Sequence, residues 1–170
     1  MYMLYCIISM NLKHKIALVL VVLGTKGFSQ WEYRADQENN TAEVVGTIQF
    51  NYEIQDSVTL HLSKSRKWGL DLSIKGNLFK KAQKYYALFE ISDQKIKVKE
   101  FMILNQRLRI LQLEDLVSNE KYEVEDFLKI LKRGKDCTLT LRSEDRVIQG
   151  YNSLSGITLA INSILNFRLR

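Results

Sequence analysis

Apolar and polar residues alternate along several short segments after residue 46, and this period of two predicts half-buried β-strands. In the second of these segments Val58, Leu60 and Leu62 share one face. The alternating segments are 47–52, 57–63, 68–74, 84–91, 95–104, 107–113, 137–142 and 146–154. The stretch 31–43 is polar after its aromatic start, and we expect it to be a loop. Leu108, Ile110 and Leu111 are expected to be buried.

The two central segments are expected to form a hairpin whose turn is Asp93 and Gln94. Apolar and oppositely charged residues would then face each other across the strands. The expected pairs are Ile91 with Ile96, Phe89 with Val98, and Glu90 with Lys97. Asp-Gln is a poor tight turn, so a one-residue slip or a longer loop is the alternative.

Two segments near the C-terminus, 122–135 and 156–167, have the period of amphipathic helices. Their apolar stripes are Val124, Phe127, Leu128 and Leu131 in the first, and Ile157, Ala160, Ile161, Ile164 and Leu165 in the second. The first segment begins with acidic residues and ends with basic ones, as the helix dipole favours. Ser155 is expected to cap the second helix.

Many antiparallel strands followed by two one-sided helices predict a mainly β or α+β fold. The expected architecture is an antiparallel sheet or a β-sandwich with two short amphipathic helices near the C-terminus. Without a proline or a Gly/Ser-rich linker, residues 30–170 are expected to form a single domain.

Residues 1–29 have the pattern of a secretory signal. The basic residues Lys13 and Lys15 precede the apolar run 16–23, which is shorter than the 18 to 20 residues, roughly, of a membrane span. Small residues follow, and cleavage is expected between Ser29 and Gln30. An uncleaved anchor and a buried core helix are the alternatives. Met10 would begin a leader of ordinary length, so we expect translation to start there.

The leader accounts for half of the chain's net charge of +6. Three of the 25 basic residues lie in it, which leaves 22 basic against 19 acidic residues and a net charge of +3 from Gln30 onward. This balance does not favour nucleic acid as a partner. After cleavage Cys137 is the one remaining cysteine, so no disulfide can form within the domain, and the mature chain contains no integral membrane segment.

No residue pattern indicates a catalytic, metal or cofactor site, and we expect no cofactor. Cys137 shares parity with Leu139 and Leu141, so its thiol is expected in the core. His61 alternates with Leu60 and Leu62, so its side chain is expected on an exposed face. Carboxylates gather around the first helix, where a hydrolase could use them as acid and base, although the helix dipole already explains them. These carboxylates are Glu114, Asp115, Glu120, Glu123, Glu125 and Asp126.

Lysines interleaved with tyrosine provide the candidate partner-binding surface. The residues are Lys80, Lys81, Lys84, Tyr86, Lys95, Lys97 and Lys99. Lysine also protects exposed strands from aggregation, so a merely solvated face is the alternative.

Parts of the chain resemble small bacterial secreted β-sandwich domains related to invasion-associated locus B and to type VI secretion-associated proteins. The resemblance lies mainly in VEDFLKILKRGKDCTLTLR (124–142) and YNSLSGITLAINSIL (151–165), with WEYRAD (31–36) and WGLDLSI (68–74) in addition. Most members have no assigned function, so the resemblance implies a fold and export, and no site residue.

We therefore expect a secreted or periplasmic domain without catalytic activity. It would bind an envelope protein or a polyanionic surface, or support an envelope assembly. A hydrolase that uses surface carboxylates and a lysine-rich binder of membrane surfaces are the alternatives.

Overall fold

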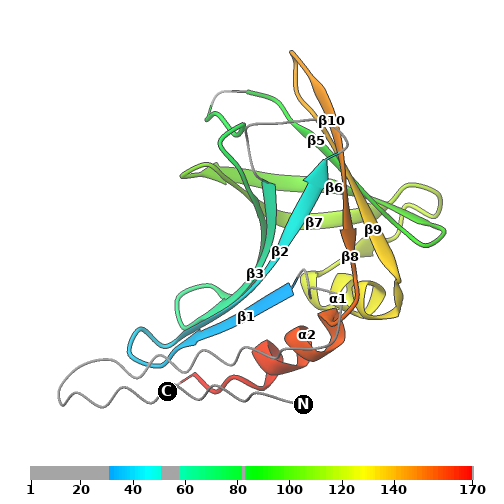
Figure 1. Ribbon diagram of the computed structural model, residues 1–170. Coiled ribbons are helices and arrows are strands. Elements are labelled where there is room, and N and C mark those ends of the chain that lie inside the picture. The colour runs from blue at the N-terminus through cyan, green and yellow to red at the C-terminus, as the bar shows by residue number, and fades with distance from the viewer. Residues whose placement is uncertain (1–30, 51–57, 82, 170) are drawn as a thin grey trace, which may run out of the picture.

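The computed structural model describes residues 31–50, 58–81 and 83–169. Within these ranges ten strands and two helices follow one another (Figure 1). In chain order they are β1 (Trp31–Asp36), β2 (Thr41–Phe50), β3 (Val58–Ser65), β4 (Gly69–Lys75), β5 (Tyr86–Ile91), β6 (Gln94–Leu104), β7 (Arg107–Asp115), β8 (Lys121–Tyr122), α1 (Val124–Arg133), β9 (Asp136–Arg142), β10 (Val147–Ser153) and α2 (Ile157–Asn166). The predicted leader, its cleavage site and Tyr52 lie outside the described residues.

The sheet closes on itself into an antiparallel barrel of eight strands, in the order β2, β10, β9, β5, β6, β7, β4 and β3. Closure depends on β2, which pairs with β3 along one edge and with β1 and then β10 along the other. β8 adds a short pairing to β7. The class mainly β is therefore confirmed, whereas the expectation of a sandwich is wrong. Alternation along each strand is the same in both architectures, and only the pairing of β2 with β3 distinguishes them.

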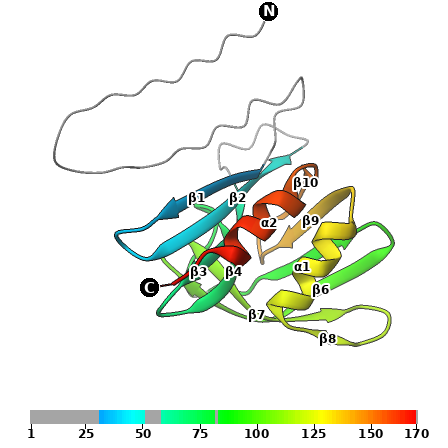
Figure 2. The ribbon, with the colours of Figure 1, turned by 90° about the horizontal axis from the view of Figure 1, so that it is seen from below.

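The two helices lie side by side across the lower end of the barrel (Figure 2). α1 buries Phe127, Leu128 and Leu131 there, as its stripe predicts. The ring of Phe127 lies 5.0 Å from that of Phe89 on β5, which joins the helix to the barrel core. None of the described helices is long and apolar enough to cross a membrane.

The predicted loop at 31–43 is wrong, because β1 and the start of β2 form a hairpin there. Trp31 is buried opposite Gly46, and its indole N–H donates to the carbonyl of Ser153 at 2.7 Å. Asn40 lies in the turn at φ 54°, a conformation that asparagine tolerates well. The burial of Trp31 against Gly46 thus stabilises β1 as a strand, although most of its residues are polar.

The predicted β5–β6 hairpin forms, but its register differs from the expected one. Ser92 and Asp93 make the turn, with Ser92 at φ 53°. Ile91 consequently faces Gln94 and Phe89 faces Ile96. The expected pairs are displaced by two residues, which leaves every side chain on its expected face because the strand period is two.

Three smaller expectations are also wrong. The N-cap of α2 is Gly156 at φ 84°, a left-handed conformation that favours glycine, and Ser155 makes no capping bond. Leu165 is exposed at the helix C-terminus. Leu111 is exposed as well, because it has the opposite parity to the buried Leu108 and Ile110 and therefore lies on the outer face of β7.

Candidate functional site: the depression beside the β9–β10 turn

The loop between β4 and β5 is held against the barrel by Tyr85, whose ring is buried beside that of Phe79. The Tyr85 hydroxyl donates to the carbonyl of Leu78 at 2.8 Å and accepts the backbone N–H of Lys80 at 2.7 Å. These bonds fix the loop that carries Lys80, Lys81 and Lys84, all of which are exposed.

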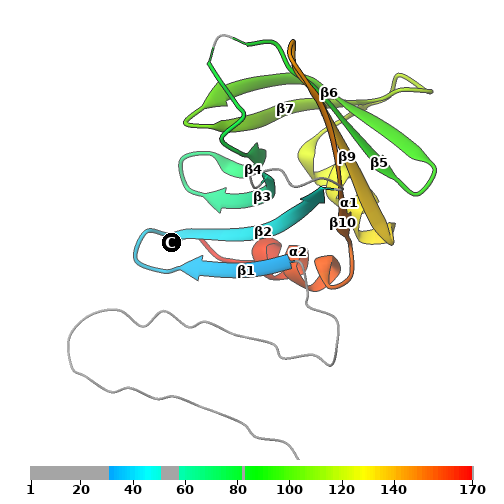
Figure 3. The ribbon, with the colours of Figure 1, turned by 45° about the horizontal axis from the view of Figure 1, so that its top comes forward.

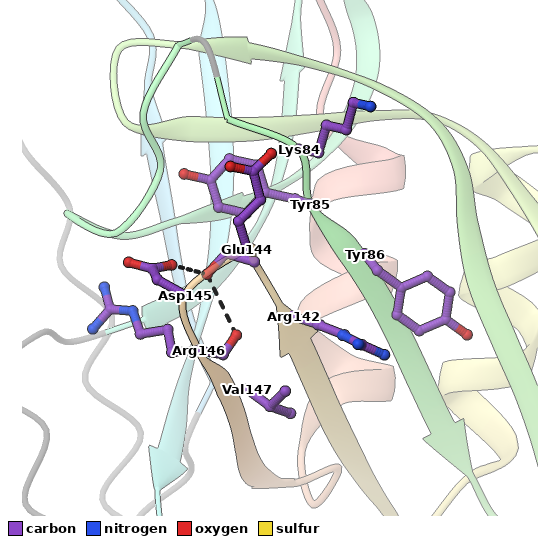
Figure 4. Close-up of a pocket in the computed structure, with 9 residues that line it drawn as sticks. Lys84, Tyr85, Tyr86, Arg142, Glu144, Asp145, Arg146 and Val147 are labelled. Atoms are coloured by element: carbon purple, nitrogen blue, oxygen red, sulfur yellow. Dashed lines mark hydrogen bonds between the residues drawn. The ribbon is translucent and has the colours of Figure 1, made fainter.

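An open depression of about 580 Å³ lies where this loop meets the β9–β10 turn. It is at the end of the barrel opposite the helices (Figures 1 and 4). Exposed Tyr86, on β5, is the direct cross-strand neighbour of exposed Arg142, on β9. The depression is lined by Lys84, Tyr85, Tyr86, Arg142, Ser143, Glu144, Asp145, Arg146 and Val147.

Positive charge is in slight excess around the depression, because three cations, Lys84, Arg142 and Arg146, line it together with the two carboxylates of Glu144 and Asp145. Asp145 accepts the Ser143 hydroxyl at 2.6 Å and the Gln83 amide at 3.0 Å. The bond from Ser143 is the main reason that the pKa of Asp145 is lowered. Arg142 and Tyr86 extend to the same side of the turn, and Arg146 to the other (Figure 4). The arrangement therefore offers a guanidinium beside an aromatic ring, a pair that suits an acidic partner.

The predicted lysine surface is divided in the structure. Lys84 and Tyr86 meet at the depression, whereas the lysines of β6 lie against carboxylates. Lys97 and Lys99 bind the two oxygens of Glu114 at 2.6 and 3.1 Å, and the hydrogen bond from Lys97 is the main reason that the pKa of this carboxyl is lowered. Lys95 lies 3.7 Å from Glu90. Arg142 was not among the predicted residues, because its place beside Tyr86 depends on the pairing of β5 with β9.

Two of the carboxylates before the first helix, Glu114 and Asp115, have partners that lower their pKa. Asp115 accepts the backbone N–H groups of Val117 and Ser118 at 2.8 and 2.9 Å, and the bond from Ser118 is the main cause of its lowered pKa. Asp126 binds Lys129 at 2.8 Å. A general acid needs a raised pKa, so the lowered pKa of Glu114 and Asp115 does not suit that role. Catalysis by these groups stays an untested alternative.

A second polar cluster lies on the outer face of β2 and β3, and the sequence did not indicate it. His61 is on the face expected for it, yet it is only 6% exposed, so the expectation of an exposed side chain is wrong. Its Nδ1 lies 2.5 Å from Glu43 Oε1, and its Nε2 lies 2.7 Å from Thr59 Oγ1. Glu43 is diagonal to His61 on the neighbouring strand, a relation that only the register shows.

Glu43→Gln is expected to reduce the acid sensitivity of the fold. The hydrogen bond with His61 holds the pKa of Glu43 below its ordinary value of 4.5. The ionised carboxylate therefore stabilises the folded state above about pH 4.5, and this contribution is lost as the pH falls through the lowered pKa. We expect the variant to be about 1 kcal/mol less stable at pH 7 and equal to wild type near pH 3 by urea unfolding.

Glu38→Gln, which removes the same charge from the β1–β2 turn, is the control, and we expect little change from it. If the Glu43 variant is less stable than wild type by the same amount at pH 7 and at pH 3, the ionised Glu43 carboxylate is not the cause of the loss.

Cys137 is buried in the core, as its parity predicts. Burial raises the pKa of its thiol to about 12, so the thiol is protonated at neutral pH and inert as a nucleophile. Within the ranges that the structure covers, no three histidine, cysteine, aspartate or glutamate side chains gather closely enough to hold a metal ion.

No protein-family model, curated protein or solved structure matches this chain.

Proposed function

We propose that the protein is an exported domain of the cell envelope that binds an acidic partner protein at the depression beside the β9–β10 turn. The exposed pair of Tyr86 and Arg142 carries this proposal. Tyrosine and arginine supply much of the binding energy at protein interfaces, and a guanidinium recognises carboxylates through paired hydrogen bonds. The anchored loop that holds Lys84 adds a cation without the cost of ordering a mobile segment.

Export to the envelope is supported by the basic residues and the short apolar run before residue 24. The resemblance of segments 124–142 and 151–165 to secreted domains points to the same compartment. A signal that is cleaved before Gln30 would leave the depression and its lysines on a domain outside the cytoplasm.

Arg142→Glu is expected to abolish retention of the partner. Immobilised wild-type protein is incubated with an extract of the native envelope, and the retained proteins are identified. The charge reversal turns an attraction for carboxylates into a repulsion, so we expect affinity for the retained partner to fall by at least about 30-fold. Tyr86→Ala is expected to weaken binding by about tenfold or more.

Arg133→Glu is the matched control, because Arg133 is also exposed but lies on α1 at the other end of the barrel. The proposal requires that this variant retain what wild type retains. If the Arg142 and Arg133 variants retain the same proteins as wild type, the depression is not the binding site.

A further inference from the structure

Trp68 stands on the turn between β3 and β4 with 51% of its surface exposed. Its backbone N–H donates to Ser65 Oγ at 3.2 Å, which fixes its place in the turn. The indole lies between two cations: Lys67 Nζ is 4.9 Å from the ring centroid and the Arg109 guanidinium is 4.3 Å from it. An exposed tryptophan held in this way is preorganised for contact with something outside the domain.

The pairing of β6 with β7 places further exposed residues next to Arg109 on the outer face of the barrel. Arg109 is the cross-strand neighbour of Met102, and Arg107 that of Leu104. Met102 is 38% and Leu104 46% exposed. The β3–β4 and β6–β7 turns lie at the two ends of β4, because Lys75, the last residue of β4, pairs with Arg107 beside the β6–β7 turn, so these residues are spread along the length of the strand (Figure 3). We call Trp68, Met102 and Leu104, with the cations around them, the Trp68 surface.

The cations of the Trp68 surface differ from those of β6 in their partners. Lys97 and Lys99 both bind Glu114, and on the Trp68 surface only Arg109 is in a comparable pair, with Asp71. Among the described residues, no carboxylate lies within ion-pair distance of the remaining cations of this surface. These are Arg66, Lys67, Lys75 and Arg107. The surface therefore combines exposed apolar side chains with an excess of positive charge.

We propose that the Trp68 surface docks on an anionic lipid bilayer. In this arrangement the indole and the apolar side chains enter the headgroup region, and the surrounding cations pair with lipid phosphates. Tryptophan is the residue that sits most readily at a membrane interface, and basic residues add electrostatic attraction to anionic lipids. Lysine is depleted at protein–protein interfaces, whereas here the Lys67 ammonium lies 4.9 Å from the centroid of the indole. Charge complementarity thus favours the bilayer.

Intrinsic fluorescence provides a direct test, because the other tryptophan, Trp31, is already buried. The full chain is mixed with vesicles of phosphatidylcholine containing about one-third phosphatidylglycerol, and with vesicles of phosphatidylcholine alone. We expect Trp68 emission to shift to shorter wavelength with the anionic vesicles only. Raising the salt to about 1 M should reverse the shift, since the Debye length is then about 3 Å.

The double variant Lys67→Glu/Arg107→Glu is expected to bind anionic vesicles at least about tenfold more weakly in co-sedimentation. The control is Lys129→Glu/Arg133→Glu, which makes the same charge change on α1 and is expected to bind as wild type does. Residues 1–30 are identical in all three proteins, so any affinity of that segment for lipid cancels in the comparison. Thermal unfolding of each variant establishes that it is folded.

Three outcomes would overturn the proposal. One is that both double variants bind anionic vesicles equally weakly, which would show that the net charge of the protein alone attracts it to the vesicles. Another is co-sedimentation without any shift of Trp68 emission. The third is a shift with soluble polyglutamate but none with anionic vesicles, which would assign the surface to an acidic protein. The Arg142 variant should bind vesicles normally, so failure here is distinguishable from failure of the proposed partner site.

Discussion

Phe127→Ala is expected to lower the free energy of unfolding by about 3–5 kcal/mol. Phe127 is completely buried where α1 covers the end of the barrel, and its ring lies 5.0 Å from that of Phe89. Truncation leaves a cavity between helix and strands, because neither the closed sheet nor the helix can collapse freely into it. Urea unfolding monitored by circular dichroism measures the effect.

The control is Leu159→Ala, since Leu159 is exposed on α2 and its truncation should change stability by no more than about 0.5 kcal/mol. In a double-mutant cycle with Phe89→Ala, the double variant should be destabilised by about 0.5–1.5 kcal/mol less than the sum of the two single losses, because the contact between the rings is lost only once. A cost of the Phe127 truncation below about 1 kcal/mol would mean that α1 does not close the barrel as described.

Gly46→Val is expected to destabilise the fold by about 1–3 kcal/mol, although valine is the better strand former of the two. A Cβ atom at position 46 would lie 2.5 Å from the ring of Trp31, on the opposing strand. The indole must move, and its hydrogen bond to the carbonyl of Ser153 would be lost. We expect Trp31 emission to shift to longer wavelength together with the loss of stability.

The matched test repeats the substitution in a Trp31→Ala background, where the obstructing ring is absent. Gly46→Val should then cost less than half as much as it does in wild type. Thr47→Val, on the exposed face of the same strand, should have little effect on stability. An equal cost of Gly46→Val in both backgrounds would show that the contact with Trp31 is not its cause.

Local patterns were sufficient to predict the helices and most strands. The apolar stripe of α1 predicts the three residues that it buries, because a period of 3.6 places them on one face whatever the helix packs against. The parity of Cys137 with Leu139 and Leu141 likewise predicts its burial. Each of these inferences depends on neighbours within a few residues along the chain.

Expectations that depended on distant residues were less successful. The stretch 31–36 is polar, and it becomes a strand because Trp31 packs on Gly46 and bonds to Ser153. The burial of His61 follows from Glu43, eighteen residues earlier in the chain. Nothing near either residue in the sequence indicates these partners, since both depend on the pairing of separate strands.

The candidate site likewise contains some residues that the sequence indicated and others that depend on the pairing of distant strands. Lysines and tyrosines could be identified as surface residues from alternation alone, and Lys84 and Tyr86 do line the depression. The sequence could not show that Glu114 binds Lys97 and Lys99, nor that Arg142 stands beside Tyr86. The net charge of the sequence includes every lysine equally. Which lysines form ion pairs with carboxylates depends on the register of the strands.

The sequence by itself determined the two helices with most of their buried residues, and the type of most strands. Periodicity carries this information because a side chain's direction is set by its own strand or helix. Only the tertiary structure decided that the sheet closes into a barrel, how its strands are in register, and that two cations, Lys67 and Arg109, lie against the Trp68 ring. Those properties arise from contacts between residues far apart in the chain, and each requires that the strands first be paired.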